Sequence, residues 1–584
     1  MTETTIARPW LDTDLSVDER VQLLLDAMTI EEKAGLFFHT MIAIGDLEEP
    51  NPVFATPSAR EFLESKQMTH FNLLGAAPTG REIAAWQNAL QQLAASTRLG
   101  IPVTLSTDPR HSFSENPGAS ILAGPFSQWP ETLGLAATRD EELVERFADI
   151  ARQEYTAVGL RVALHPQVDL ATEPRWARQT ATFGEDAELS GKLGAAYIRG
   201  FQGKLFGPGS VSTMTKHFPG GGPQKDGEDP HFPYGREQVY PGGEFELHLK
   251  PFEDALAAGT RQMMPYYGMP VGTEYEEVGF GFNKSVITGL LRERYGFDGL
   301  VCTDWGLISD SEIFGQPFPA RAWGVEDLTP RERMKKVLDA GADQFGGEAN
   351  PELLLELVAD GEITEARLDI SARRILREKF ELGLFENPYV DEDAADEIVG
   401  RADFRAAGED AQRASITVLA NDGALPFARG AKLYVEGIDV AVAEKFADVV
   451  ETPSEADLAI IRLQAPFEER ATMFENFFHA GSLDFPDDVI AHVGEVAAVV
   501  PTVVDVLADR PPILTPLAEV AAAITVNWGA SGAALLDVLS GAFPAQGRLP
   551  FDLPRSMAAV ETSRPDVPFD TTDPLFRFGH GLSL

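Results

Sequence analysis

The sequence predicts an α/β protein in two domains: an N-terminal (β/α)8-like TIM barrel, then a smaller α/β sandwich with an open, mostly parallel sheet. The chain has 584 residues, which is too long for a single hydrophobic core. Short apolar runs alternate with helical stretches in both halves, and this alternation is typical of parallel sheets. Polar residues follow several of these runs directly, at the strand ends where a barrel carries its chemistry.

Two helices are expected at the start of the chain. Residues 16–19 and 29–32 are capping boxes, in which a Ser or Thr is followed three residues later by Glu. Apolar residues at helical spacing follow the first box. Both helices should therefore precede the first clear strand.

Six apolar runs are predicted as strands of the first domain: residues 101–107, 159–168, 210–215, 262–266, 300–303 and 340–345. They extend over about 370 residues, which fits a (β/α)8-like barrel with insertions. The alternation by itself is equally compatible with a doubly wound sheet. Asn350 and Pro351 then begin a helix that Gly361 ends.

The second half shows the same alternation. Its predicted strands are residues 416–420, 432–436, 458–463, 502–507 and 523–527, and its helices lie near 442–450, 486–499, 516–522 and 531–539. This indicates a small open sheet with helices on both faces. An acidic, Ala-rich stretch separates the halves, so we assign 1–388 to the barrel, 389–412 to a linker that becomes helical, and 413–584 to the sandwich.

The charge balance excludes some partners. Lys and Arg number 48 and Asp and Glu 91, so the formal net charge is −43. Nucleic acids and anionic membranes bind basic patches, so neither is expected as a partner. Hydrophobic residues make up 44% and charged residues 24%, which is ordinary for a soluble globular protein.

Cys302 is the only cysteine, so no intrachain disulfide and no cysteine-based metal site can form. No apolar stretch reaches the ~20 residues of a membrane span. The N-terminus lacks the basic start and apolar run of a secretory signal. We therefore expect a cytoplasmic protein, unless a leader was trimmed.

Asp304 is the first candidate for catalysis. The apolar run 300–303 ends at Asp304, followed by Trp305 and a glycine. A charge at the end of a buried strand is costly unless something requires it there. We interpret Asp304 as a nucleophile and Trp305 as part of a sugar-binding wall. The alternative is an aspartate that caps the next helix.

Other polar residues follow the remaining strands. Lys216 and His217 can donate several hydrogen bonds to one polyhydroxylated ligand, although a Lys–Asp bridge and a satisfied histidine would be structural alternatives. Asp108 can accept from two adjacent sugar hydroxyls. Arg175 and Arg178 flank a tryptophan, and one of them should serve structure. No metal-ligand spacing or phosphate-binding loop is present, so no cofactor is expected.

The order and spacing of these motifs resemble glycoside hydrolase family 3. Its Lys-His-Phe motif matches residues 216–218, its Ser-Asp-Trp motif matches 303–305, and its arginine segment matches 174–186. Residues 16–35, 414–427, 547–550 and 578–583 resemble its opening and its second domain. The resemblance covers about residues 10–584 and stops where the sandwich ends, before the fibronectin-like third domain of many relatives.

The resemblance implies a retaining exo-β-glycosidase, a β-glucosidase by expectation, that removes the terminal non-reducing sugar of a small-molecule or oligosaccharide β-glycoside. Such enzymes use two carboxylates about 5–5.5 Å apart, and Asp304 would form the glycosyl-enzyme. The sugar would be held by Asp108, Arg178, Lys216 and His217, with Trp305 beside its ring and Tyr266 near the nucleophile. Arg178 matches the family's sugar-binding arginine by its distance from Phe183, whereas Arg175 does not.

In the family, the acid/base residue comes from a loop of the second domain. The corresponding loop here follows the predicted strand 458–463. Its position favours Glu469, then Glu468, then Glu475. An exposed glutamate with no catalytic role is the alternative, because 91 acidic residues make such a residue common.

The sequence also departs from the family pattern. Ser112, which follows Arg110 and His111, occupies the position where the family usually has a glycine. Asp229-Pro230-His231 is similar to the Asp-Ser-His triplet of the β-N-acetylglucosaminidase branch, so His231 as acid/base, in that activity or a phosphorylase, is an alternative. A β-xylosidase, a non-enzymatic sugar-binding protein and a homo-oligomer are further possibilities.

Overall fold

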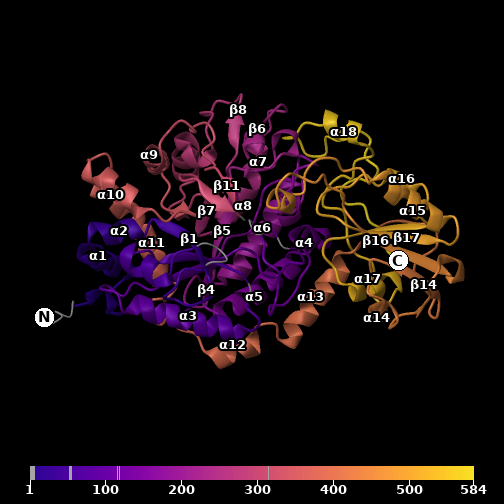
Figure 1. Ribbon diagram of the computed structural model, residues 1–584, viewed down its shortest axis with the longest axis horizontal. Coiled ribbons are helices and arrows are strands. Elements are labelled where there is room, and N and C mark those ends of the chain that lie inside the picture. Colours follow the sequence, from indigo (N-terminus) through magenta and orange to yellow (C-terminus); the bar gives the residue numbers. More distant parts are fainter. Residues whose placement is uncertain (1–6, 52–55, 76, 115, 117–118, 314) are drawn as a thin grey trace.

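The computed structural model describes residues 7–51, 56–75, 77–114, 116, 119–313 and 315–584. The chain forms two α/β units that lie side by side, with indigo to magenta segments in the larger unit and orange to yellow segments in the smaller one (Figure 1). Helices α1 (Val17–Ala27) and α2 (Ile30–Gly35) begin at the two predicted capping boxes.

The larger unit contains eight parallel strands in the order β12-β1-β2-β3-β4-β5-β7-β9. They are β1 (Phe38–Ala43), β2 (His70–Leu74), β3 (Thr104–Thr107), β4 (Leu160–Ala163), β5 (Ser212–Phe218), β7 (Gln262–Pro265), β9 (Leu300–Val301) and β12 (Phe345–Gly346). A parallel bridge between Cys302 and Gln344 connects β9 to β12, so the sheet curls round on itself. The predicted barrel architecture is confirmed.

Helices cover the outside of this sheet: α3 (Gly80–Ala95), α4 (Thr132–Thr138), α5 (Glu141–Ala157), α6 (Ala187–Gln202), α7 (Phe245–His248), α8 (Lys250–Ala257), α9 (Pro330–Ala340), α10 (Pro351–Ala359) and α11 (Glu365–Glu381). A π-helix spans Ser285–Arg294. Two small sheets lie apart from the barrel sheet: β6 (Glu237–Val239) with β8 (Met269–Val271), and β10 (Ser311–Ile313) with β11 (Gln316–Phe318).

Strands β1 and β2 were not among the predicted strands, because polar residues interrupt their apolar pattern. His39 and His70 are fully buried inside the barrel, and His39 Nε2 lies 2.7 Å from Ser106 Oγ. Burial lowers the pKa of His39 to about 3, so the imidazole is neutral.

Helices α12 (Glu392–Ile398) and α13 (Ala402–Ser415) connect the units. Helix α12 packs on α3 and α5, and α13 packs on α4 and on α17 (Gly532–Leu539) of the smaller unit. The connection therefore lies against both units along the lower edge of the molecule (Figure 1).

The smaller unit holds a six-stranded sheet in the order β13-β18-β17-β16-β14-β15, parallel except for β13 against β18. Its strands are β13 (Thr417–Asn421), β14 (Lys432–Glu436), β15 (Asp448–Val449), β16 (Leu458–Gln464), β17 (Thr502–Leu507) and β18 (Ala523–Asn527). The other helices are α14 (Val440–Ala443), α15 (Asp487–Ala497), α16 (Thr515–Ala518) and α18 (Met557–Thr562). The predicted open, mostly parallel sheet is confirmed.

One predicted helix of this unit, at residues 442–450, is wrong. Helix α14 ends at Ala443, and the chain then pairs β15 with the free edge of β14, where Lys432 lies opposite Asp448. Edge pairing satisfies backbone groups of β14 that would otherwise lack partners within the sheet.

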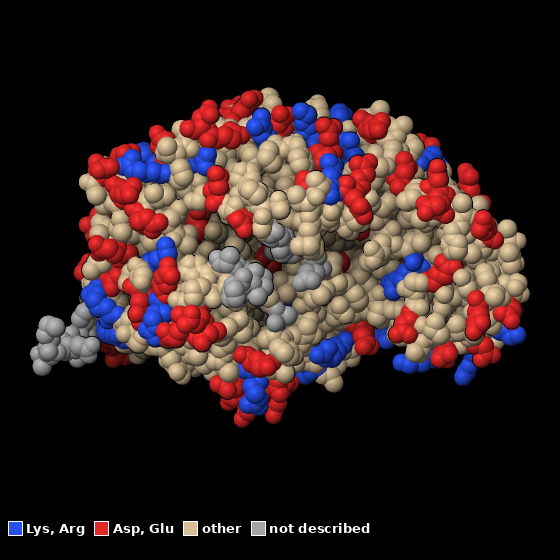
Figure 2. All heavy atoms as spheres, in the orientation of Figure 1, with Lys and Arg blue, Asp and Glu red and all other residues tan. Residues whose placement is uncertain are grey.

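The surface agrees with the acidic composition. On the face shown in Figure 2, acidic side chains lie among basic ones along the margins, and the area between is largely uncharged. Among the described residues, no helix is long and apolar enough to cross a membrane.

Candidate active site

The carboxyl ends of the barrel strands bring polar side chains together. Asp108 directly follows β3, and Lys216 and His217 end β5. Tyr266 directly follows β7, and Asp304 lies just beyond β9. Parallel strands present these ends at one edge of the sheet, so residues far apart in sequence share one site.

Lys216 and Asp108 form one side of the site. Lys216 Nζ lies 3.4 Å from Asp108 Oδ1, and Asn72 Nδ2 donates to the other carboxylate oxygen at 3.1 Å. Burial lowers the pKa of the Lys216 ammonium, although nearby Asp108 opposes this. Lys216 is thus a donor and Asp108 an acceptor for hydroxyl groups.

His217 is held by a carboxylate that the sequence analysis did not select. Its Nδ1 lies 2.7 Å from Asp169 Oδ2, and Asp169 Oδ1 accepts the backbone N–H groups of His217 and Gly221. Burial raises the pKa of Asp169 to about 6 and lowers the pKa of His217 well below its usual range. A neutral imidazole that donates Nδ1–H to Asp169 has a lone pair on Nε2.

Arg178 lies beside this lone pair. Its Nη2 is 3.4 Å from His217 Nε2 and donates to Gln167 Oε1 at 3.2 Å. Burial opposes the charge of the guanidinium, but the carboxylates of Asp229 and Asp304 raise the pKa of Arg178. Arg178 therefore stays cationic in a buried place.

By contrast, Arg175 binds away from this cluster. Its guanidinium donates to both oxygens of Glu173, at 2.8 and 3.0 Å. It also lies 3.7 Å from Asp226 Oδ1. Arg175 and Arg178 therefore have different partners, and only Arg178 contacts His217.

Asp304 lies at the centre of the cluster. Its Oδ1 accepts the N–H of Trp305 at 2.8 Å, and its Oδ2 is 3.8 Å from His217 Nε2. Asp304 is 7% exposed, so its carboxylate is shielded yet reachable. Trp305 is half-buried, and its indole lies against the backbone of Gly346 and Gly347.

Two adjacent tyrosines line the site. The Tyr266 ring packs on His217 with centroids 4.8 Å apart, and it meets Trp176 edge-on. Tyr267 donates to the carbonyl of Trp305 at 2.8 Å. Burial, and after it the charge of Asp304, raise the pKa of Tyr267, in accord with a position near Asp304.

His231 and Asp229 form a second carboxylate–imidazole pair. His231 Nδ1 lies 2.6 Å from Asp229 Oδ1, which also accepts the His231 N–H at 2.9 Å. The His231 ring packs between Tyr267 and Phe478, with centroids 4.6 and 4.5 Å away. Burial disfavours the Asp229 charge, but His231 and Arg178 lower its pKa below the usual value.

A loop of the smaller unit, residues 465–482, reaches this pair. Phe474 and Phe478 pack with Phe232 and Phe318 of the barrel. Glu468 Oε1 accepts the N–H of Ser482 at 3.1 Å.

The two other candidate glutamates of the 465–482 loop differ. Glu475 accepts from Tyr234 Oη at 2.9 Å and from the N–H of Thr472 at 2.9 Å. Glu469 is exposed and makes no hydrogen bond or ion pair with the described residues. The structure thus places the loop beside His231, with Glu469 unengaged.

Asp169 and Tyr267 were missed by the sequence analysis. Asp169 directly follows the predicted strand 159–168, so the strand-end signal that selected Asp304 also applied to it. Tyr267 adjoins Tyr266, and no local pattern in the sequence indicates that its ring also lies at the site.

The cluster contains several buried polar atoms without a hydrogen-bond partner in the part of the chain that the structure describes. They are Asp304 Oδ2, Arg178 Nε, Tyr266 Oη, Asp229 Oδ2 and Trp305 Nε1. Donors, acceptors and an indole around one carboxylate match the needs of a sugar ring. No group of three or more His, Cys, Asp or Glu among the described residues is arranged to hold a metal ion.

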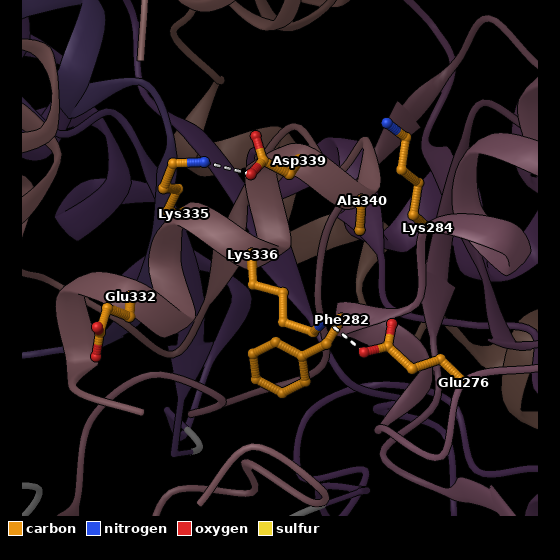
Figure 3. Close-up of a pocket in the computed structure, with 8 residues that line it drawn as sticks. All are labelled: Glu276, Phe282, Lys284, Glu332, Lys335, Lys336, Asp339 and Ala340. Atoms are coloured by element: carbon orange, nitrogen blue, oxygen red, sulfur yellow. Dashed lines mark hydrogen bonds and ion pairs between the residues drawn. The ribbon is translucent and has the colours of Figure 1, made fainter. Parts of the chain in front are cut away.

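A separate hollow of about 310 Å³ lies on the outer wall, between α9 and residues 276–284 (Figure 3). Lys335 and Lys336 line it, but each pairs with a carboxylate, Asp339 at 2.5 Å and Glu276 at 2.8 Å. It contains none of the strand-end residues, so it is not the candidate site.

Comparisons with known proteins agree with this fold. The model of the glycosyl hydrolase family 3 N terminal domain matches residues 53–378, and that of the family 3 C-terminal domain matches residues 408–584. Beta-glucosidase C of Emericella nidulans is 52% identical over 572 residues, covering 97% of this chain and 92% of that protein. The periplasmic beta-glucosidase/beta-xylosidase of Dickeya chrysanthemi is 42% identical over 599 residues, covering 98% and 91%.

Solved structures share the architecture. A b-glucosidase of Erythrobacter marinus superposes with a TM-score of 0.80 at 21% identity, covering 99% of this chain and 84% of that one. A beta-glucosidase of Listeria innocua, in complex with isofagomine, gives 0.76 at 22% identity, covering 97% and 83%. Because the family models match both units in order, and relatives over 40% identical extend across nearly the whole chain, the chain belongs to glycosyl hydrolase family 3.

Proposed function

We propose that this enzyme is a retaining exo-β-glucosidase that removes the terminal non-reducing glucose of a small β-glucoside. The observation that carries the proposal is the buried Asp304 carboxylate, whose Oδ2 lacks a hydrogen-bond partner among the described residues and is 3.8 Å from His217 Nε2. Relatives whose names state β-glucosidase activity support the choice of sugar.

In this proposal Asp304 attacks the anomeric carbon and carries the glycosyl group. Lys216 and Arg178 donate to sugar hydroxyls, whereas Asp108 and His217 Nε2 accept from them. Trp305 contacts the ring from the side of β9, and Tyr266 holds the His217 imidazole in place. The charged and oriented groups are fixed before the substrate binds, which is how an enzyme favours the transition state.

Glu469 is the proposed acid/base. Of the three loop glutamates, Glu468 binds a backbone N–H and Glu475 binds Tyr234, so their carboxylates are engaged. The Glu469 carboxylate has no partner within the described residues and can turn toward the leaving oxygen. It would protonate that oxygen first and activate water in the second step.

A second candidate rests on the Asp229–His231 pair. The 2.6 Å contact orients Nδ1 toward the carboxylate and leaves Nε2 as the reactive nitrogen, a geometry suited to proton transfer. With His231 as acid/base, the enzyme would be a β-N-acetylglucosaminidase or a phosphorylase. A β-xylosidase is the closest alternative in sugar specificity, since the name of the Dickeya relative includes both sugars.

Initial rates on nitrophenyl β-glycosides test these functions. The panel contains the glucoside, xyloside, galactoside and N-acetylglucosaminide, each with and without phosphate. We expect the glucoside to give the highest initial rate, and we expect that rate to be the same with and without phosphate. If the N-acetylglucosaminide gives the highest rate, or if the rate depends on phosphate, we would assign the acid/base role to His231.

A further inference from the structure

The 465–482 loop is anchored at its base by one buried cation. Arg510 follows β17 and is 0% exposed. Its guanidinium donates to the carbonyls of Pro466 and Gly481, at 2.6 and 3.2 Å, and to the barrel carbonyl of Arg175 at 3.0 Å. Both ends of the loop are therefore tied to each other and to the barrel.

The side-chain amide of Asn476 holds the backbone of the segment after Glu469. Asn476 Oδ1 accepts the Arg470 N–H at 2.6 Å, and Asn476 Nδ2 donates to the Arg470 carbonyl at 3.1 Å. One side chain thus engages both backbone groups of the residue that follows the proposed acid/base. Rotation of the backbone next to Glu469 is restricted as a result.

Arg470 also connects this segment to the barrel. Its Nη2 lies 2.8 Å from Glu228 Oε1, and the two side chains are 27% and 24% exposed. The guanidinium lies over the Tyr234 ring at 5.7 Å, and Tyr234 donates to Glu475 of the same loop. The ion pair is mostly shielded from water, so losing one partner leaves the other charge poorly solvated.

Glu228 directly precedes Asp229, whose carboxylate raises the pKa of Arg178 in the sugar site. One barrel segment therefore connects the sugar-binding groups to the loop that carries Glu469. Glu469 itself makes no polar contact with the described residues, so its position depends on its neighbours.

We propose that the interdomain ion pair between Arg470 and Glu228 positions the Glu469 carboxyl at the leaving-group oxygen. Arg470 and Glu228 are positioning residues that act through the backbone of the loop. This inference rests on the proposed function, in which Glu469 is the acid/base. Misplacing a general acid slows the reaction of substrates with poor leaving groups, which need protonation, far more than that of substrates with good ones.

The test compares kcat/KM for methyl β-glucoside, a poor leaving group, with that for 2,4-dinitrophenyl β-glucoside, a good one. We expect Arg470→Gln and Glu228→Gln to lower the first value roughly 10- to 100-fold and the second by less than about threefold. Arg470→Lys should retain an intermediate rate, because it keeps the charge without the planar fork. Glu469→Ala provides the reference for complete loss of the acid.

The control is an ion pair of similar length and burial. Arg413 Nε lies 2.7 Å from Asp537 Oδ2, with side chains 19% and 25% exposed, and it joins α13 to α17. Arg413→Gln should lower the thermal midpoint comparably and leave the ratio of the two kcat/KM values unchanged.

The outcomes are distinguishable. An unchanged ratio in Arg470→Gln and Glu228→Gln, with an active wild type, would overturn the positioning role alone. If Glu469→Ala also leaves the ratio unchanged, the acid/base assignment and the positioning role are both overturned. A wild type inactive on both glucosides would overturn the proposed function as well.

Discussion

Asp169 Oδ2 lies 2.7 Å from His217 Nδ1, and the second oxygen of this carboxylate accepts two backbone N–H groups. The contact fixes both the orientation and the tautomer of the imidazole, so that the lone pair on Nε2 lies beside Arg178 Nη2, at 3.4 Å, and can accept a hydrogen bond. Asp169 therefore acts on the site through His217. The proposed role of His217 Nε2 is to accept a hydrogen bond from a sugar hydroxyl.

Asp169→Asn should therefore lower kcat/KM on a β-glucoside by about 10- to 100-fold, the cost of one charge-assisted hydrogen bond. An amide cannot accept from Nδ1–H and from both backbone donors at once. Steady-state kinetics with the nitrophenyl glucoside measures the effect, and circular dichroism checks the fold. Unchanged kcat/KM would show that His217 does not need this partner.

The same carboxylate predicts a pH dependence. The pKa of Asp169 is raised to about 6, chiefly by burial, so the ionised acceptor is lost as the pH falls through that value. We expect kcat/KM to decrease below about pH 6 because a protonated Asp169 no longer accepts from Nδ1–H. The Asp169→Asn variant, slower at every pH, should lack this decrease; a decrease of equal size in the variant would assign it to another group.

Asp304→Asn should lower kcat by several orders of magnitude, because an amide cannot form the glycosyl-enzyme. In Asp304→Gly, azide can enter from the face that the carboxylate occupied and attack the anomeric carbon. The expected product is the α-glucosyl azide, identified by NMR, at a rate that rises with azide concentration. A variant Asp304→Asn with a tenth of wild-type activity would remove Asp304 from the nucleophile role.

The sequence predicted the strands that a local apolar pattern marks, and it did not predict the strands without such a pattern. Strands β14, β17 and β18 match their predicted bounds because continuous apolar runs end at clear turns. Strands β1 and β2 were missed because the barrel interior contains buried imidazoles, those of His39 and His70, which interrupt the apolar pattern.

For the site, strand ends were informative and distant pairings were not. Asp108, Lys216 and Asp304 each end an apolar run, and they lie at one edge of the barrel. The Arg470–Glu228 pair joins residues 242 positions apart in different units. Hydrophobic periodicity contains no record of which loops meet across an interface.

The close contact between the Trp305 indole and Gly346 leads to a further prediction. A Cβ on Gly346 would clash with the backbone carbonyl oxygen of Thr303 and lie 2.7 Å from Trp305 Cε3, so Gly346→Ala must displace the backbone before Asp304, the indole, or both. We expect about 1–3 kcal/mol lower stability and a raised KM for the glucoside. Gly289→Ala is the matched control, since a Cβ there meets nothing within 4 Å. Equal KM values in both variants would contradict a contact between Trp305 and the sugar.

The interface between the units contains a carboxyl group with a raised pKa. Glu185 is 6% exposed and accepts the backbone N–H groups of Asp552, at 2.5 Å, and Phe569, at 2.9 Å. Burial raises the pKa of Glu185 to about 8, although these hydrogen bonds oppose the shift. The folded protein therefore holds a proton that the unfolded chain releases near the ordinary glutamate pKa of 4.5.

Stability should consequently fall as the pH rises from about 5 to about 8. Between the two pKa values the folded state binds more protons, so each pH unit lowers the free energy of unfolding by at most about 1.4 kcal/mol. Glu185→Gln is neutral throughout and lacks this contribution. Urea unfolding at matched pH values should show the wild type losing stability relative to the variant as the pH rises. A difference that stays constant would mean that Glu185 is ionised in the folded protein across this range, with its two backbone hydrogen bonds outweighing burial.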